Sequence, residues 1–171
     1  MSISRRGFIK LTGAGAVSSV AGGVAAQEDR SPTVQAAASY PEITIARLAD
    51  LSENEPVAFQ YPDSSSLCEL IKCGRAMPGG IGPDQDIVAY SILCPHMGCP
   101  TQYDRESRRY RCGCHFSLFD PEMDGQQIMG QATQDLPRVL LKLDEASGEI
   151  RAAGLNRLIF GRQQNILTNN G

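Results

Sequence analysis

The sequence predicts an all-β fold of antiparallel strands. From residue 40 onward, short runs rich in Val, Ile, Tyr and Phe alternate with Gly, Pro, Asn and Asp residues, a pattern typical of strands joined by turns. In the same region no stretch keeps its apolar residues at helical spacing over three turns. Residues 45–51 are compatible with a short helix, and we expect no longer one.

Seven segments have strand character. We expect strands at residues 43–46, 56–61, 67–72, 86–93, 108–111, 139–143 and 150–153. Residues 145–149, Glu-Ala-Ser-Gly-Glu, predict a hairpin turn between the last two, and Asp124-Gly125 predicts another turn. Residues 27–39 are polar and rich in Ala, so we expect a mobile linker there, followed by a single domain over residues 40–171.

The first 26 residues carry an export pattern. Residues 4–10, Ser-Arg-Arg-Gly-Phe-Ile-Lys, resemble a twin-arginine signal, S/T-R-R-x-F-L-K, and precede an uncharged Gly/Ala-rich run. That run, residues 11–26, is shorter than the roughly 20 residues that span a bilayer. Small residues at 24–26 suit cleavage before Gln27. We therefore expect residues 1–26 to be a signal peptide that takes the folded protein to the periplasm; the alternative is an uncleaved anchor that keeps it at the membrane.

Charge narrows the class of partner. The chain has 16 basic and 19 acidic residues, and without residues 1–26 it has 13 and 19, a net charge of −6. An acidic domain of this kind is a poor binder of nucleic acid. Whether residues 1–26 are a cleaved signal peptide or an uncleaved anchor, we expect the domain to lie outside the cytoplasm, where a disulfide persists.

Four residues form the most informative motif. They read C-x-H, then fifteen residues, then C-x2-H, and they are Cys94, His96, Cys112 and His115. Each of two short segments supplies one thiolate and one imidazole. Thiolates suit iron–sulfur chemistry, and imidazole ligands raise the potential of an iron–sulfur cluster.

Zinc is the first alternative for this motif. A structural Cys2His2 zinc site usually brings like ligands together, as C-x2-4-C and H-x3-5-H. Here each segment mixes a cysteine with a histidine, and zinc gives no role to the interleaved Cys99 and Cys114. A purely structural disulfide knot is a second alternative. An iron–sulfur centre explains more of the pattern than either.

The two segments resemble a known family. Residues 94–99, Cys-Pro-His-Met-Gly-Cys, and 112–117, Cys-Gly-Cys-His-Phe-Ser, are similar to the C-T-H-x-G-C and C-P-C-H-G-S boxes of Rieske iron–sulfur proteins. The resemblance implies an antiparallel β base domain with an inserted cluster-binding subdomain, here about residues 90–137. It also implies that each box follows a strand.

The family resemblance assigns a role to each residue of the boxes. The implied ligands of one [2Fe-2S] cluster are two cysteines on one iron, Cys94 and Cys112, and two histidines on the other, His96 and His115. Cys99 and Cys114 are implied to form a disulfide between the boxes.

Three further residues are expected to tune the cluster. Ser117 matches the family's serine that donates a hydrogen bond to a cluster sulfur. High-potential members carry a Tyr where this chain has Phe119, so one donor is missing here. Phe116 replaces the usual Gly of the second box. We expect an intermediate potential, within about −150 to +300 mV but below the top of that range.

Segments outside the boxes narrow the resemblance. Residues 67–74, 78–91 and 130–138 look like the small, Rieske subunit of arsenite oxidase. This resemblance implies a heterodimer with a large molybdopterin and iron–sulfur catalytic subunit. It also implies a cytochrome c or cupredoxin as electron acceptor.

The histidine count limits the chemistry. The chain has two histidines, and both are assigned to the cluster. None remains for the mononuclear iron of an oxygenase or as a base for Ser117. We therefore expect a subunit that moves electrons and has no catalytic residue of its own. The alternatives are the Rieske subunit of a quinol-oxidising cytochrome bc complex, which would favour a Tyr at 119, and a Rieske ferredoxin, which usually lacks the disulfide pair.

Two smaller predictions concern Met97 and the remaining cysteines. Met97 is either an apolar contact for a partner protein or a residue that packs within its own loop. Cys68 and Cys73 lie on opposite faces of an extended segment, about 16 Å apart, so we expect them to be unbridged.

Overall fold

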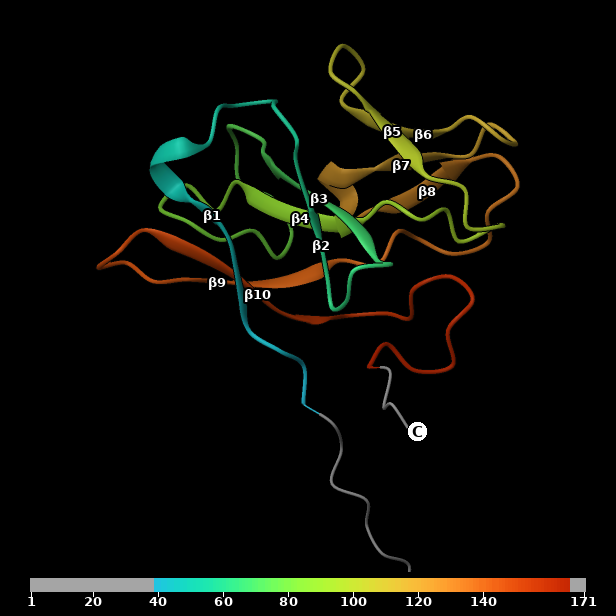
Figure 1. Cartoon of the computed structure of the whole chain (residues 1–171). Helices are drawn as coiled ribbons and strands as arrows, with labels where there is room; N and C mark the ends of the chain where they lie inside the picture. Colours follow the sequence, from blue (N-terminus) through green and yellow to red (C-terminus); the bar gives the residue numbers. More distant parts are fainter. Residues whose placement is uncertain (1–38, 167–171) are drawn as a thin grey trace, which may run out of the picture. The chain divides into compact units, whose positions relative to one another are not determined.

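The structure, a computed structural model, describes residues 39–166, and its regular secondary structure is almost entirely β-strand (Figure 1). The strands are β1 Ile43–Arg47, β2 Val57–Gln60, β3 Leu67–Lys72, β4 Ile87–Ser91, β5 Thr101–Asp104, β6 Arg109–Cys112, β7 Leu118–Asp120, β8 Gln126–Met129, β9 Val139–Leu143 and β10 Glu149–Leu155. Two single-turn 3-10 helices, η2 Leu48–Asp50 and η3 Pro121–Met123, complete the described elements. The predicted signal peptide, residues 1–26, and all but the last residue of the predicted linker lie outside the described residues.

The strands form three antiparallel sheets. One has the order β1-β10-β9, a second β2-β3-β4, and a third β5-β6-β7-β8. The third sheet is inserted in the chain between β4 and β9. Tyr90 of β4 forms an isolated bridge with Arg138, the residue directly before β9. This is the predicted arrangement of a base domain with an inserted subdomain.

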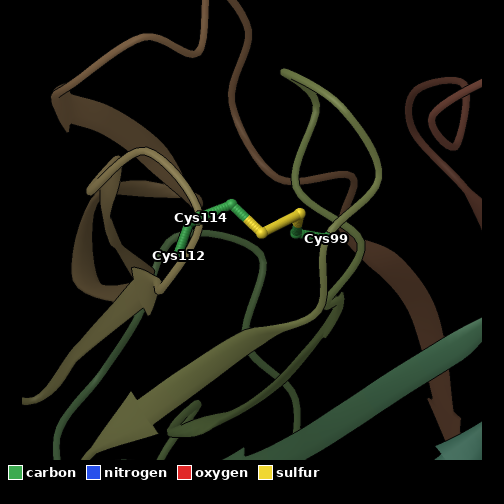
Figure 2. Close-up of side chains that lie close together, drawn as sticks. All are labelled: Cys99, Cys112 and Cys114. Carbon is green, nitrogen blue, oxygen red and sulfur yellow. A yellow bond between two sulfur atoms is a disulfide. The ribbon is translucent and has the colours of Figure 1, made fainter.

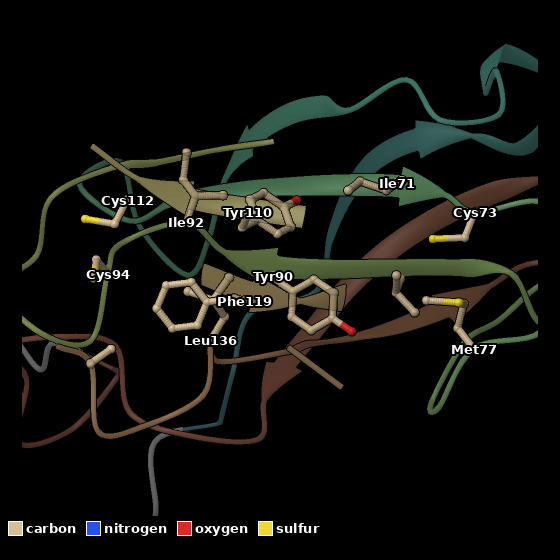
Figure 3. Packing of buried hydrophobic residues seen from close by; sticks show 12 residues of the cluster. Ile71, Cys73, Met77, Tyr90, Ile92, Cys94, Tyr110, Cys112, Phe119 and Leu136 are labelled. Carbon is tan, nitrogen blue, oxygen red and sulfur yellow. The ribbon is translucent and has the colours of Figure 1, made fainter. Parts of the chain in front are cut away.

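Strand β4 joins the two hydrophobic cores because its five residues are all buried. Ile87 and Ala89 pack in the core shared by the two three-stranded sheets. Val88 and Tyr90, on the other face, pack in the core that reaches the inserted sheet (Figure 3). Alternate residues of a strand point to opposite faces, so one strand can serve both cores. The second core also contains Cys94 and Cys112 and therefore fixes the boxes to the base.

Each of the seven predicted strands is present, with ends that differ by a few residues. Three strands of the inserted sheet, β5, β7 and β8, were not predicted, because they have only three or four residues, too few to show a strand pattern. The short helix expected within residues 45–51 is the 3-10 turn η2. Among residues 39–166, no helix has the length and apolar character needed to cross a membrane.

Cys68 and Cys73 are free thiols, as predicted. Cys68 faces the core between the three-stranded sheets, whereas Cys73 faces the core next to the inserted sheet. Burial raises the pKa of Cys68 to about 12 and that of Cys73 to about 11. Both thiols are therefore protonated and poorly nucleophilic at neutral pH.

Candidate metal centre

The first box, residues 94–99, is a tight loop between β4 and β5. The backbone N–H of Gly98 donates to the carbonyl of Cys94 at 2.8 Å, and the N–H of Cys94 donates to the carbonyl of Cys99 at 2.9 Å. Gly98 has a φ of +73°, a left-handed conformation that glycine adopts without steric cost. These contacts close the loop and hold its side chains in fixed directions.

The second box, residues 112–117, connects β6 to β7. It is closed in a similar way: the N–H of Cys112 donates to the carbonyl of Ser117 at 2.9 Å, and the N–H of Phe116 donates to the carbonyl of Cys112 at 3.0 Å. Phe116 has a φ of +60°, which is unfavourable for a residue with a side chain. Its ring is exposed, and the guanidinium of Arg111 lies 5.4 Å from the ring centroid.

A disulfide joins the boxes, as predicted. Cys99 and Cys114 are bonded with an S–S distance of 2.11 Å (Figure 2). Their sulfurs and that of Cys112 lie within 4.8 Å of one another. Because two of these three sulfurs are bonded to each other, Cys112 is the member of this group that remains free to bind iron.

The two predicted cysteine ligands lie together at the edge of the core. The side chains of Cys94 and Cys112 are each 1% exposed. Burial raises the pKa of Cys94 above its ordinary value; the backbone N–H of His96 opposes this shift, and the hydrogen bond with the Cys112 thiol adds to it. Two buried thiols in contact match the sulfur ligands of a single iron, which would bind them as thiolates.

The two predicted histidine ligands form the outer pair. The ring centroids of His96 and His115 are 4.7 Å apart, with the rings nearly perpendicular at 85°. His115 is exposed and His96 is partly exposed. The Nδ1 atom of His96 is nevertheless buried and has no hydrogen-bond partner among the described residues. A buried ring nitrogen without a partner is costly, and an iron at this position would satisfy it. The donor set therefore fits a cluster with a buried sulfur side and an exposed histidine side.

Ser117 lies in the core at the end of the second box. Its side chain is fully buried, and its Oγ accepts a hydrogen bond from the N–H of Ala132 at 2.9 Å. Because the hydroxyl hydrogen is not used in that bond, Ser117 can donate it to a sulfur.

The segment after β8 packs against the backbone of the second box, a contact that was not predicted from the sequence. A β-carbon built on Gly130 would lie 2.4 Å from the Cα of Ser117, so this backbone approach requires glycine. Gly130 was the signal that could have revealed this contact.

Phe119 lies beneath the boxes in the core. It is fully buried and pairs with Tyr110 across β6 and β7. Met97, in contrast, is 61% exposed at the end of the first box. The exposed residues next to the histidines are thus apolar, Met97 on one box and Phe116 on the other.

Comparisons with known proteins agree with this geometry. A family model of the Rieske [2Fe-2S] domain matches residues 42–140. The chain is 35% identical over 131 residues to the iodate reductase subunit IdrB of Denitromonas iodatirespirans, an alignment that covers 75% of this chain and 70% of that protein. It is 36% identical over 127 residues to the subunit of the same name from Pseudomonas sp. strain SCT, covering 72% of this chain and 65% of that one.

A solved structure has the same fold. The soluble domain of the Rieske protein II (soxF) from Sulfolobus acidocaldarius matches with a TM-score of 0.63 and 23% sequence identity, over 72% of this chain and 82% of that one. At this identity the match concerns the fold alone.

Proposed function

Since this chain belongs to the Rieske [2Fe-2S] family and carries one such cluster, we propose that it is the electron-transfer subunit of a periplasmic oxidoreductase that acts on an inorganic oxyanion. The observation that carries the proposal is the arrangement of the two boxes, in which two buried thiols lie behind two histidines that reach the surface. A bound [2Fe-2S] cluster supplies a one-electron couple at this place.

The chain's own residues hold and orient that cluster. Cys94 and Cys112 would bind the inner iron, and His96 and His115 the outer one. The Cys99–Cys114 disulfide keeps the two boxes at a fixed separation. With both histidines used in this way, the chain has no histidine left for substrate chemistry. The reaction of the substrate therefore belongs to a separate catalytic subunit.

Two oxyanions are alternative candidates for the substrate of that catalytic subunit. Arsenite follows from the resemblance of residues 67–74, 78–91 and 130–138 to the small subunit of arsenite oxidase. Iodate follows from the names of the two relatives, which are iodate reductase subunits. The two differ in the direction of electron flow, because arsenite gives electrons to the complex and iodate takes them.

The partners are proposed to meet the exposed apolar end of the boxes. The exposure of Met97 supports a protein contact over packing within its own loop. A large molybdopterin catalytic subunit is the permanent partner in this proposal, and a cytochrome c or cupredoxin is the small redox partner. The twin-arginine motif of residues 4–10 supports export of the folded chain to the periplasm, with an uncleaved anchor as the alternative.

The alternative functions have less support. Phe119 lacks the hydroxyl expected in the Rieske subunit of a quinol-oxidising bc complex. The disulfide is unusual for a Rieske ferredoxin. Both relatives named above align with more than two thirds of this chain and are subunits of an enzyme complex.

The test is purification of the chain from its host with whatever subunit binds to it. Arsenite should reduce the cluster in the complex if the protein is part of an arsenite oxidase. Iodate should reoxidise the dithionite-reduced cluster if it is part of an iodate reductase. A chain that purifies without a molybdenum-containing partner, and whose cluster responds to neither anion, would contradict the proposal.

A further inference from the structure

The loop that follows β10, residues 156–166, has no regular secondary structure but is held by a buried asparagine. Asn165 is 5% exposed. Its Oδ1 accepts a hydrogen bond from the N–H of Ile159 at 2.9 Å, and its Nδ2 donates to the carbonyl of Arg157 at 2.7 Å and to the hydroxyl of Tyr40 at 2.9 Å. The side chain of Ile159 is buried in the base. These contacts give the loop a fixed shape.

Ion pairs attach the same loop to the rest of the domain. The guanidinium of Arg162 binds both carboxylate oxygens of Asp63, at 2.6 and 3.0 Å. Arg157 lies 3.2 Å from the carboxylate of Asp135, in the segment next to the second box. A two-oxygen contact between guanidinium and carboxylate fixes orientation as well as distance. The loop is therefore a rigid support.

The residue that this support presents to the first box is Phe160. A β-carbon built on Gly98 would lie 2.6 Å from Cδ1 and 2.9 Å from Cε1 of Phe160, so the ring occupies the space that a side chain at position 98 would fill. Gly98 follows His96 by two residues and precedes the disulfide residue Cys99. The ring thus packs against the backbone between a predicted ligand and the disulfide.

The ring also forms one wall of an opening beside the first box. A cleft of about 200 Å3 lies there, and Pro95, Gln134, Leu158 and Phe160 are among its lining residues. Pro95 stands between Cys94 and His96. Phe160 itself is 40% exposed, so its burial contributes less to folding than that of a core phenylalanine.

We propose that Phe160 is a positioning residue for the cluster: it holds the backbone of the first box in place and limits the access of water through the cleft beside Pro95. The inference rests on the assignment of residues 94–99 as a cluster-binding loop. A ligand loop that can move changes the orientation of its imidazole, and water near the cluster stabilises the reduced form, which carries one more negative charge. Phe160 therefore keeps the potential low and the cluster retained.

The test compares Phe160→Ala with Leu158→Ala in the full chain loaded with iron and sulfide. Leu158 is a matched control, because it is 50% exposed in the same loop and lines the same cleft, while the ring against Gly98 stays in place. Phe160→Ala should change the line shape of the reduced cluster's electron paramagnetic resonance signal and raise its potential. Loss of the cluster to a chelator should be roughly tenfold faster, the change that about 1.4 kcal/mol produces.

Leu158→Ala should leave the line shape and the rate of cluster loss as in the wild type and should raise the potential less than Phe160→Ala does. Phe160→Leu should give a smaller change than Phe160→Ala. If Phe160→Ala does not fold, as judged by circular dichroism, the line shape, potential and rate of cluster loss of Phe160→Leu alone test the proposal. Wild-type behaviour of the Phe160 variants, or equal effects at position 158, would overturn the inference. If the wild type itself forms no [2Fe-2S] cluster, the proposed function fails instead.

Discussion

Phe116 offers a sharp test of how the second box is built, because its backbone is left-handed while its side chain is large. Its φ is +60°, and this conformation costs a residue with a β-carbon about 1–2 kcal/mol. The exposed cation–π contact between the Arg111 guanidinium and the Phe116 ring offsets about 0.5–1 kcal/mol of this cost. Alanine at this position would keep the cost and lose the contact. Glycine would lose the contact and remove the cost.

We therefore expect Phe116→Gly to be more stable than Phe116→Ala. Glycine makes the unfolded chain more flexible, which lowers the stability of that variant by roughly 0.4–1 kcal/mol. The expected difference in unfolding free energy between the glycine and alanine variants is therefore on the order of 1 kcal/mol. For a domain of this size that is roughly 4 °C in the midpoint of thermal unfolding, followed by circular dichroism on the cluster-loaded protein. Arg111→Ala, alone and combined with Phe116→Gly, measures the ring contact separately.

The functional counterpart is partner binding. If a strained phenylalanine is kept at the exposed end of the box for a protein contact, Phe116→Gly should bind the catalytic subunit more weakly while unfolding no earlier than wild type. An alanine variant as stable as the glycine variant would refute the backbone argument. Unchanged binding by Phe116→Gly would refute the proposed contact.

Three other predictions follow from single positions. Phe119→Tyr should raise the potential by tens of millivolts if the added hydroxyl donates to a cluster sulfur, and voltammetry showing no rise with the hydroxyl in place would contradict this. Arg162 holds the pKa of Asp63 well below its usual range. The ion pair therefore contributes its full stabilisation at pH values above the unfolded-state pKa, about 4, and progressively less as the pH falls below that value. The stability difference between wild type and Asp63→Asn, measured by urea unfolding, should therefore shrink below about pH 4; a difference that stays constant down to acid pH would exclude this ion pair as its source. Arg5→Lys with Arg6→Lys should leave the cluster-loaded chain in the cytoplasm, and continued export of the double variant would mean that residues 4–10 are not a twin-arginine signal.

The boxes and the base strands could be predicted because their information is local. The spacing of Cys94, His96, Cys112 and His115 is visible in the sequence, and so is the pairing of Cys99 with Cys114 once the family is recognised. Strands such as 67–72 and 86–93 have enough β-branched and aromatic residues to be identified. The strand preference of such residues depends on side chains that are neighbours in the sequence, so it can be recognised without knowledge of the fold.

The inserted sheet and the supports of the site depend on distant contacts. The strand Thr101–Asp104 is short and mostly polar, and it pairs because Tyr103 packs on Tyr110 in the core. The loop after β10 has no periodic pattern, and one of the contacts that hold it joins Arg162 to Asp63, 99 residues apart in the chain. No local signal in the sequence indicates either contact.

The central claim is that the two boxes hold one [2Fe-2S] cluster through two cysteines and two histidines. The most direct test measures iron, acid-labile sulfide and the reduced paramagnetic resonance spectrum of the purified chain, beside His96→Ala and Cys112→Ala. The wild type should contain two irons and two sulfides per chain and give a rhombic reduced signal that both variants lose. One zinc ion per chain without labile sulfide, or an unchanged signal in either variant, would contradict the account.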